Sequence, residues 1–179
     1  MHQPTSFTRA DMLQLFERLN DELAADGIQG EVYLVGGAVM CLALDARPAT
    51  QDVDAWFQPA RAVREAAARV AVKAGVPATW LNDAVKGWLS PRGAFDPFLD
   101  RSHLKVFVAQ PGYLLAMKCM AMRLGEEFHD LDDVRYLLRY LNIASAHEAL
   151  AVVTAYFDPA QLPAKTRFAL EELLPTGSS

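Results

Sequence analysis

The pattern of apolar and polar positions divides the first 110 residues into alternating helices and strands. Apolar residues recur every three or four positions over residues 9–25, and this spacing predicts a helix with Thr8 as its N-cap. Two short apolar runs rich in β-branched and aromatic residues, 31–35 and 104–109, predict buried strands.

A further strand, predicted at 51–57, shows strict alternation. Asp52, Asp54 and Trp56 fall on one of its faces, because successive side chains of a strand point in opposite directions. Short helices are predicted on either side of this strand, over 38–44 and over 59–74.

The rest of the chain separates into an irregular stretch and a helical part. Residues 75–101 hold several Pro and Gly and show no regular period. After residue 110 the predicted elements are all helices: 111–124, 130–141, 146–156 and 159–174. The predicted class is therefore α/β (α+β), with a core over 1–110 and a C-terminal helical bundle over 111–179.

Composition narrows the class of protein. A chain of 179 residues with 52% hydrophobic residues is long enough to bury its own core. Its apolar runs are all well short of the roughly 20 residues that cross a membrane, so no membrane association is expected. Cys41 and Cys119 lie in apolar segments and are predicted to be free buried thiols, which makes the cytoplasm the expected location.

The net charge of −5 argues against a broad basic surface for binding DNA. It leaves room for a local nucleotide site and for a site built from carboxylates around a metal.

The combination that carries chemistry is Gly36-Gly37 followed by Asp52-x-Asp54. Two carboxylates at alternate strand positions can hold Mg²⁺ (or Mn²⁺), which prefers oxygen ligands and usually shares them with substrate phosphates. A Gly-Gly turn before a helix lets the backbone approach a phosphate closely. Each motif alone has a plainer interpretation, since Gly pairs mark ordinary turns and acidic strands are often solvated faces.

In this order the two motifs resemble a known superfamily. The stretch VGGAVMCLALDARPATQDVD, residues 35–54, is similar to the signature of the DNA-polymerase-beta-like nucleotidyltransferases. With Arg47 and Thr50 before the acidic pair, it looks like the minimal nucleotidyltransferases of the AbiEii type, which include toxin components of toxin–antitoxin and abortive-infection systems. A second block, LLAMKCMAMRLGEEFHDLDDVRYLL at 114–138, resembles the helical block of the same family.

The resemblance implies a nucleotidyltransferase fold, a small mixed sheet flanked by helices, and a role for particular residues. Gly36, Gly37 and Thr50 would bind the nucleotide, and Asp52 and Asp54 would bind the metal and act in catalysis.

The helical block would complete the site from the C-terminal bundle, so that both domains share one cleft. Lys118 would contact a phosphate, and Asp130 or Asp133 would join the catalytic set. Plainer roles are open for each: Lys118 can extend its charge to the surface, and Asp130 can be an N-cap with Asp133 in the first turn.

Larger members of the superfamily carry a third carboxylate on a strand beside the acidic pair. The predicted strand 104–109 has Lys105 and no acid, while Asp96 and Asp100 fall in a predicted loop upstream. Asn82 and Lys86 either line the cleft, against base or acceptor, or belong to an ordinary amphipathic segment. The third acid thus stays open, and with it the general base.

The leading hypothesis is a Mg²⁺-dependent enzyme that transfers an NMP from an NTP to a hydroxyl of tRNA, a protein or a small molecule. As a toxin-system component it would have a cognate antitoxin as partner. The alternative is a catalytically degenerate protein of the same fold that acts as a binding or antitoxin module.

Overall fold

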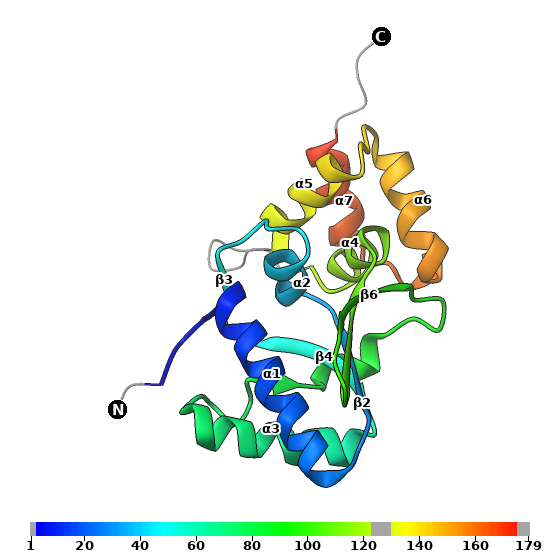
Figure 1. Ribbon diagram of the computed structural model, residues 1–179. Coiled ribbons are helices and arrows are strands. Elements are labelled where there is room, and N and C mark those ends of the chain that lie inside the picture. Colours follow the sequence, from blue (N-terminus) through cyan, green and yellow to red (C-terminus); the bar gives the residue numbers. More distant parts are fainter. Residues whose placement is uncertain (1–2, 123–129, 175–179) are drawn as a thin grey trace. The chain divides into compact units, whose positions relative to one another are not determined.

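The computed structural model describes residues 3–122 and 130–174, and the chain forms two compact units. The N-terminal unit comprises Met1–Gly87 and Phe95–Ala109, and the C-terminal unit comprises Trp88–Ala94 and Gln110–Ser179 (Figure 1). The last residues of the predicted helix 111–124 and the tail after Leu174 lie partly or wholly outside the described residues.

A mixed five-stranded sheet forms the centre of the N-terminal unit, in the order β5-β4-β2-β7-β6. Its strands are β2 (Gly30–Leu34), β4 (Val53–Gln58), β5 (Leu81–Asn82), β6 (Phe95–Asp100) and β7 (Leu104–Ala109). β2 runs antiparallel to β4 and parallel to β7, while β4 pairs with β5 in parallel. A separate two-stranded sheet joins β1 (Phe7–Thr8) to β3 (Ala49–Thr50). The predicted mixed α/β class is confirmed.

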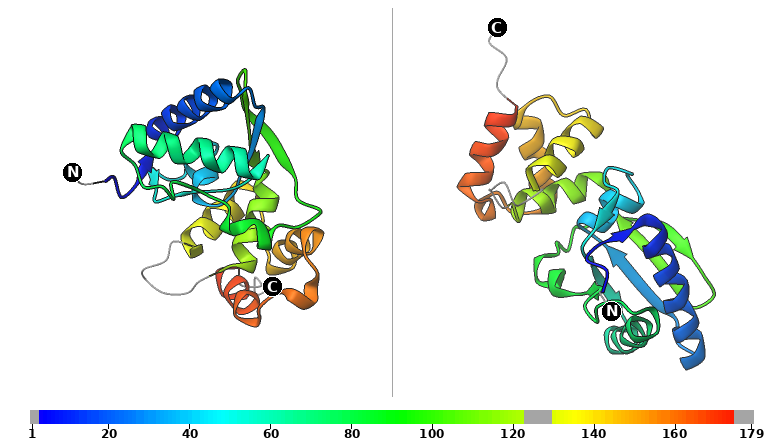
Figure 2. Two further views of the ribbon diagram at one scale, coloured as in Figure 1. Left: turned by 90° about the horizontal axis from the view of Figure 1, so that it is seen from below. Right: turned by 90° about the vertical axis from the view of Figure 1, so that its left-hand side faces the viewer.

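Two helices, α1 (Arg9–Asp26) and α3 (Ala60–Ala74), lie side by side on one face of this sheet (Figure 2). The β4 residues on the helix-covered face, Val53, Ala55 and Phe57, are buried. Alternation in the sequence predicts this burial, since every second β4 residue is apolar. The opposite face carries Asp54 and Trp56, both of intermediate exposure.

The boundaries of α1 follow from its caps. Thr8 accepts a hydrogen bond from the Asp11 backbone N–H, and the Asp11 carboxylate accepts one from the Thr8 backbone N–H, which forms a capping box. Gly27 ends the helix in the left-handed region, with φ 66°. The predicted helix and N-cap are confirmed, with the end one residue later than expected.

The C-terminal unit is helical, as predicted. Its helices are α4 (Pro111–Met120), α5 (Asp130–Tyr140), α6 (Ala146–Tyr156), the 3-10 turn η2 (Pro159–Gln161) and α7 (Ala164–Leu173). The prediction of one helix over 159–174 is wrong, because Pro163 caps α7 and separates it from η2. No helix of the described residues has the length and apolar character needed to cross a membrane.

The short segment Trp88–Ala94 belongs to the C-terminal unit because it packs on Tyr113 of α4. The Ser90 backbone N–H donates to the Tyr113 hydroxyl over 3.0 Å, and the Ser90 hydroxyl donates to the Tyr156 carbonyl. Tyr113 is fully buried, and its ring lies 5.1 Å from that of Tyr156. A Cβ on Gly93 would come within 2.5 Å of the Tyr113 ring, so the contact requires glycine there.

Candidate functional site

The glycine turn predicted to bind phosphate lies between β2 and α2 (Gly37–Leu42) in the N-terminal unit. Gly36 has φ 66° and ψ −147°, a conformation that only glycine adopts without strain. A Cβ on Gly36 would lie 3.4 Å from Asp54 Oδ2, so the carboxylate of Asp54 sits directly against the turn. The structure therefore brings together the two motifs that the sequence placed 16 positions apart.

The second glycine is enclosed more tightly than the first. A Cβ on Gly37 would lie 2.7 Å from Thr50 Oγ1 and 2.9 Å from Arg47 Nη1, so no larger residue fits without displacing them. Thr50 is buried, and its hydroxyl donates to the Asp52 carbonyl over 3.1 Å. Thr50 thus fixes the backbone just before β4, whatever it does toward a ligand.

Arg47 is a residue of this site to which the sequence analysis assigned no role. Its guanidinium lies against Gly37, so the turn has a cation next to Gly37 and the Asp54 carboxylate next to Gly36. Its position in the sequence, between the glycine turn and the acidic pair, could have indicated that Arg47 lies at this site.

Asp52 and Asp54 hold their positions through backbone pairing. The Asp54 carbonyl accepts a hydrogen bond from the Val35 N–H over 3.0 Å, which ties β4 to the residue preceding Gly36. Asp52 lies immediately before β4 and is exposed. The alternation of the strand, continued by one residue, puts its side chain on the Asp54 face.

Helix α2 itself adds little to anion binding. It has six residues, fewer than two turns, and its residues from Ala38 to Leu42 are all buried. The expected contribution of a helix dipole at Gly37 is correspondingly small. What the structure shows at the two glycines is the close approach of Asp54, Thr50 and Arg47 to the backbone.

Two carboxylates are a sufficient protein contribution for Mg²⁺. This cation keeps several waters and is usually bound by one or two carboxylates together with substrate phosphates. Within residues 3–122 and 130–174, no three His, Cys, Asp or Glu side chains gather into a larger metal site. Asp52 and Asp54 therefore fit a cation that a phosphate-bearing substrate helps to hold, and do not form a closed protein cage.

The prediction that Asp96 and Asp100 lie in a loop is wrong, because both belong to β6. Asp96 pairs with Val108, Val108 with Leu34, and Leu34 with Ala55. Paired residues share a face, so Asp96 lies on the face of Ala55 and away from Asp54.

β6 also forms the edge of the sheet, and β2 and β7 lie between it and β4. Neither Asp96 nor Asp100 is therefore placed to act as a third carboxylate beside Asp54. The strand next to Asp54 is β5, where Asn82 is its partner in register.

The second group of predicted residues gathers in the C-terminal unit. Lys118 Nζ lies 2.8 Å from Asp133 Oδ2 and 3.5 Å from Asp130 Oδ1. All three side chains are largely buried, with exposed fractions of 13% for Lys118, 4% for Asp133 and 8% for Asp130. The interpretation that Lys118 reaches to the surface is wrong, since its ammonium turns to carboxylates.

We call Lys118, Asp130 and Asp133 the Lys118 cluster. Since Lys118 contacts both aspartates, both remain candidates for the role that the resemblance implies. An ammonium has three donors, and two of those of Lys118 point at Asp130 and Asp133. Asp133 lies in the first turn of α5, as the capping interpretation expects, but Asp130 is itself a helical residue and not the N-cap. The cluster forms within one unit, and the glycine turn with the acidic pair forms within the other.

Neither cysteine is a nucleophile in this structure. Both are buried and free, as the sequence predicted. Burial raises the pKa of the Cys119 thiol to about 12, and burial also raises the pKa of Cys41 in α2. The reactive thiolate is therefore scarce at neutral pH in both.

Aromatic side chains gather on the face of the sheet that carries Asp54. Tyr33 lies at the centre of this group, with ring centroids 4.8 Å from Trp56 and 4.7 Å from Phe107. Burial and a hydrogen bond to Glu31 raise the pKa of Tyr33 to about 12, so the phenol stays protonated and donates to that carboxylate over 2.8 Å. This part of the face holds no group poised for acid–base chemistry at neutral pH.

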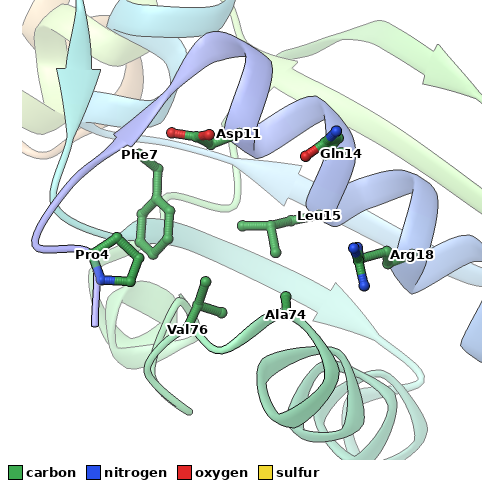
Figure 3. Close-up of a pocket in the computed structure, with 8 residues that line it drawn as sticks. All are labelled: Pro4, Phe7, Asp11, Gln14, Leu15, Arg18, Ala74 and Val76. Carbon is green, nitrogen blue, oxygen red and sulfur yellow. The ribbon is translucent and has the colours of Figure 1, made fainter. Parts of the chain in front are cut away.

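A pocket of about 200 Å³ lies elsewhere, between the start of α1 and the end of α3 (Figure 3). Its lining residues are Pro4, Phe7, Asp11, Gln14, Leu15, Arg18, Ala74 and Val76. None of the predicted site residues is among them, and its one carboxylate, Asp11, is engaged in the α1 capping box. This pocket therefore has no part in the candidate site.

Comparisons of the chain with protein-family models, curated proteins and solved structures found no match.

Proposed function

We propose that this protein is a Mg²⁺-dependent nucleotidyltransferase that moves an NMP from an NTP to a hydroxyl acceptor. The observation that carries the proposal is the contact between the glycine turn and the acidic strand. Asp54 Oδ2 would touch a Cβ at Gly36, and the Arg47 guanidinium would touch one at Gly37. Metal ligands, a close backbone and a cation thus meet at one point, which suits a triphosphate bound through a divalent cation.

Each residue of this turn has a task in the proposed reaction. Asp52 and Asp54 would hold the cation, which neutralises charge on the phosphates when it is bound. Gly36 and Gly37 would admit the triphosphate to backbone distance. Arg47, always charged, would bind phosphate oxygens in a fixed geometry.

The family resemblance implies a separate contribution from the Lys118 cluster, which we propose as a role to be tested by substitution. Lys118 would contact phosphate with its remaining ammonium donor, and Asp130 and Asp133 would orient it. The family resemblance implies a catalytic role for one of these aspartates, and in this proposal Asp130 and Asp133 share it. The proposed acceptor is a hydroxyl of tRNA, a protein or a small molecule, and a cognate antitoxin and a cytoplasmic location are part of the same proposal.

The decisive experiment measures binding and transfer of radiolabelled NTPs by the full chain with Mg²⁺ or Mn²⁺. Asp54→Asn should abolish both, because it removes a ligand charge at the turn. Asp96→Asn is the matched control, since the same substitution falls on the other face of the same sheet. If the unchanged chain neither binds nor transfers any of the four NTPs, the proposal is wrong.

A parallel pair of variants tests the Lys118 cluster. Lys118→Gln should weaken NTP binding, while Lys165→Gln, at an exposed position of α7, should leave it unchanged. Equal binding by both variants would remove Lys118 from the proposed site.

One observation favours the catalytically degenerate binding protein as second candidate. The residue opposite Asp54 on β5 is the neutral amide Asn82, whereas larger members of the superfamily carry a third carboxylate on a strand beside the acidic pair. A degenerate protein would bind nucleotide without Mg²⁺ and give no transfer to any acceptor. The same radiolabel assay, run with and without EDTA, separates the two candidates.

A further inference from the structure

Asn82 lies in direct register with the central carboxylate of the candidate site. β4 and β5 run parallel, with Val53 opposite Leu81 and Asp54 opposite Asn82. Residues paired in this way present their side chains on the same face, about 4.8 Å apart along the hydrogen-bonding direction. Burial agrees, since Val53 and Leu81 are both buried while Asp54 and Asn82 are both partly exposed.

The neighbouring acid does not share this position. Asp83 follows Asn82, and its carboxylate accepts a hydrogen bond from Arg64 Nη2 over 2.6 Å. Arg64 and Lys86 hold the pKa of Asp83 below its usual range, against the opposing effect of burial. Asp83 is therefore committed to an ion pair with α3, and Asn82 is the β5 residue whose side chain lies beside Asp54.

The amide group of Asn82 could act as a metal ligand beside Asp54. Across the described residues, its amide makes no hydrogen bond to another side chain or backbone group. The amide oxygen is a hard, neutral donor of the kind that divalent cations accept together with carboxylates. Two oxygens bound to one Mg²⁺ at about 2.1 Å lie within about 4.2 Å of each other, a span that side chains of adjacent paired strands can bridge.

We propose that Asn82 is the third protein ligand of the cation held by Asp52 and Asp54, through its amide oxygen. The Asn82 proposal rests on the proposed function, because that function supplies the metal. What it adds is the set of protein ligands, which would be two carboxylates and one neutral amide. The protein charge at the cation is then −2, one unit less than with a third acid. The site consequently depends on the phosphates of its substrate to hold the metal.

The test measures Mn²⁺ binding to the full chain by electron paramagnetic resonance, alone and with a non-hydrolysable NTP analogue. Asn82→Ala should raise the Kd for Mn²⁺ about tenfold, by the effect typical of lost metal-site groups. Asn82→Asp should lower the Kd by a similar factor, because it adds a charge at the ligand position. A gain in affinity cannot come from misfolding, so this second variant keeps the test valid if the alanine variant is unstable.

Matched controls make the same chemical changes away from the site. Gln14→Ala and Gln14→Glu alter an exposed amide on α1 of the same unit and should leave the Kd unchanged. If Mn²⁺ binding is lost in Asp54→Asn but unaffected by both Asn82 variants, Asn82 is no ligand and the two-carboxylate site stands. If the unchanged chain binds no Mn²⁺ with or without nucleotide, the metal site and the role of Asn82 both fail.

Discussion

Replacing Gly36 by alanine should destabilise the N-terminal unit more than the same change at Gly27. The two residues have the same φ, 66°, and differ in ψ, which is −147° at Gly36 and 29° at Gly27. Gly27 is thus in the left-handed helical region, and Gly36 is in a region that side chains essentially never occupy. The comparison isolates the backbone conformation of the predicted phosphate turn.

The free-energy costs of the two alanine substitutions follow from backbone conformation, because an added Cβ meets no severe clash at either position. A Cβ on Gly27 meets no atom within 4 Å, and one on Gly36 meets Asp54 Oδ2 at 3.4 Å, an ordinary contact. Alanine in the left-handed region costs about 1 kcal/mol, and alanine in the Gly36 region costs about 2–3 kcal/mol. Loss of freedom in the unfolded chain is the same for both variants and cancels in the comparison.

Urea unfolding followed by tryptophan fluorescence measures this difference. Trp80, one of the three tryptophans of the chain, is buried in the N-terminal unit, donates its indole N–H to the Ala67 carbonyl over 3.0 Å, and contributes to this signal. The expected free energy of unfolding of Gly36→Ala is about 1–2 kcal/mol below that of Gly27→Ala. Equal losses, or a larger loss for Gly27→Ala, would refute the conformation assigned to the turn.

Three further predictions concern polar contacts. Lys73 and Arg69 lower the pKa of Glu22, so the stabilisation is present above the unfolded pKa near 4.5 and is lost as pH falls through the folded value. Glu22→Gln should therefore cost about 1 kcal/mol at pH 7 and less at pH 4, and a loss independent of pH in urea unfolding would contradict this. Lys118→Met should cost about 3 kcal/mol, because it removes a cation from two buried carboxylates; a thermal unfolding curve like that of the unchanged chain would count against the cluster. Thr166→Val should cost about 1 kcal/mol by leaving the Cys119 carbonyl without its 2.8 Å hydrogen bond, measured by the same unfolding curves, with Thr166→Ser as the conservative comparison.

Elements with a strong period were predictable from the sequence. The helix at 9–25 and the strand at 104–109 appear within one residue of their predicted ends, because caps and alternation are local properties. The burial alternation of β4 also followed directly, and with it the face on which Asp54 lies. The meeting of Gly36 and Asp54 was predictable only as a family resemblance, since nothing local in the sequence brings them together.

Elements stabilised by distant partners were missed. β6 carries Pro97 and a register shift before Leu99, so its pattern is irregular, and it is a strand only because β7 pairs with it. β5 has two residues, too few to show a period, and the place of Asn82 beside Asp54 depends on that pairing. The contact of Arg47 with Gly37 likewise depends on the path of a loop, which composition does not determine.

The edges of the five-stranded sheet bear on how copies of this protein behave at high concentration. β6 forms one edge, where Pro97 lacks a backbone donor, the register shift interrupts the ladder, and Asp96 and Asp100 add charge. At the other edge, β5 pairs over only two residues. A second chain therefore finds no long run of regularly spaced donors and acceptors on which to add a strand, and the sheet resists aggregation by edge-to-edge growth.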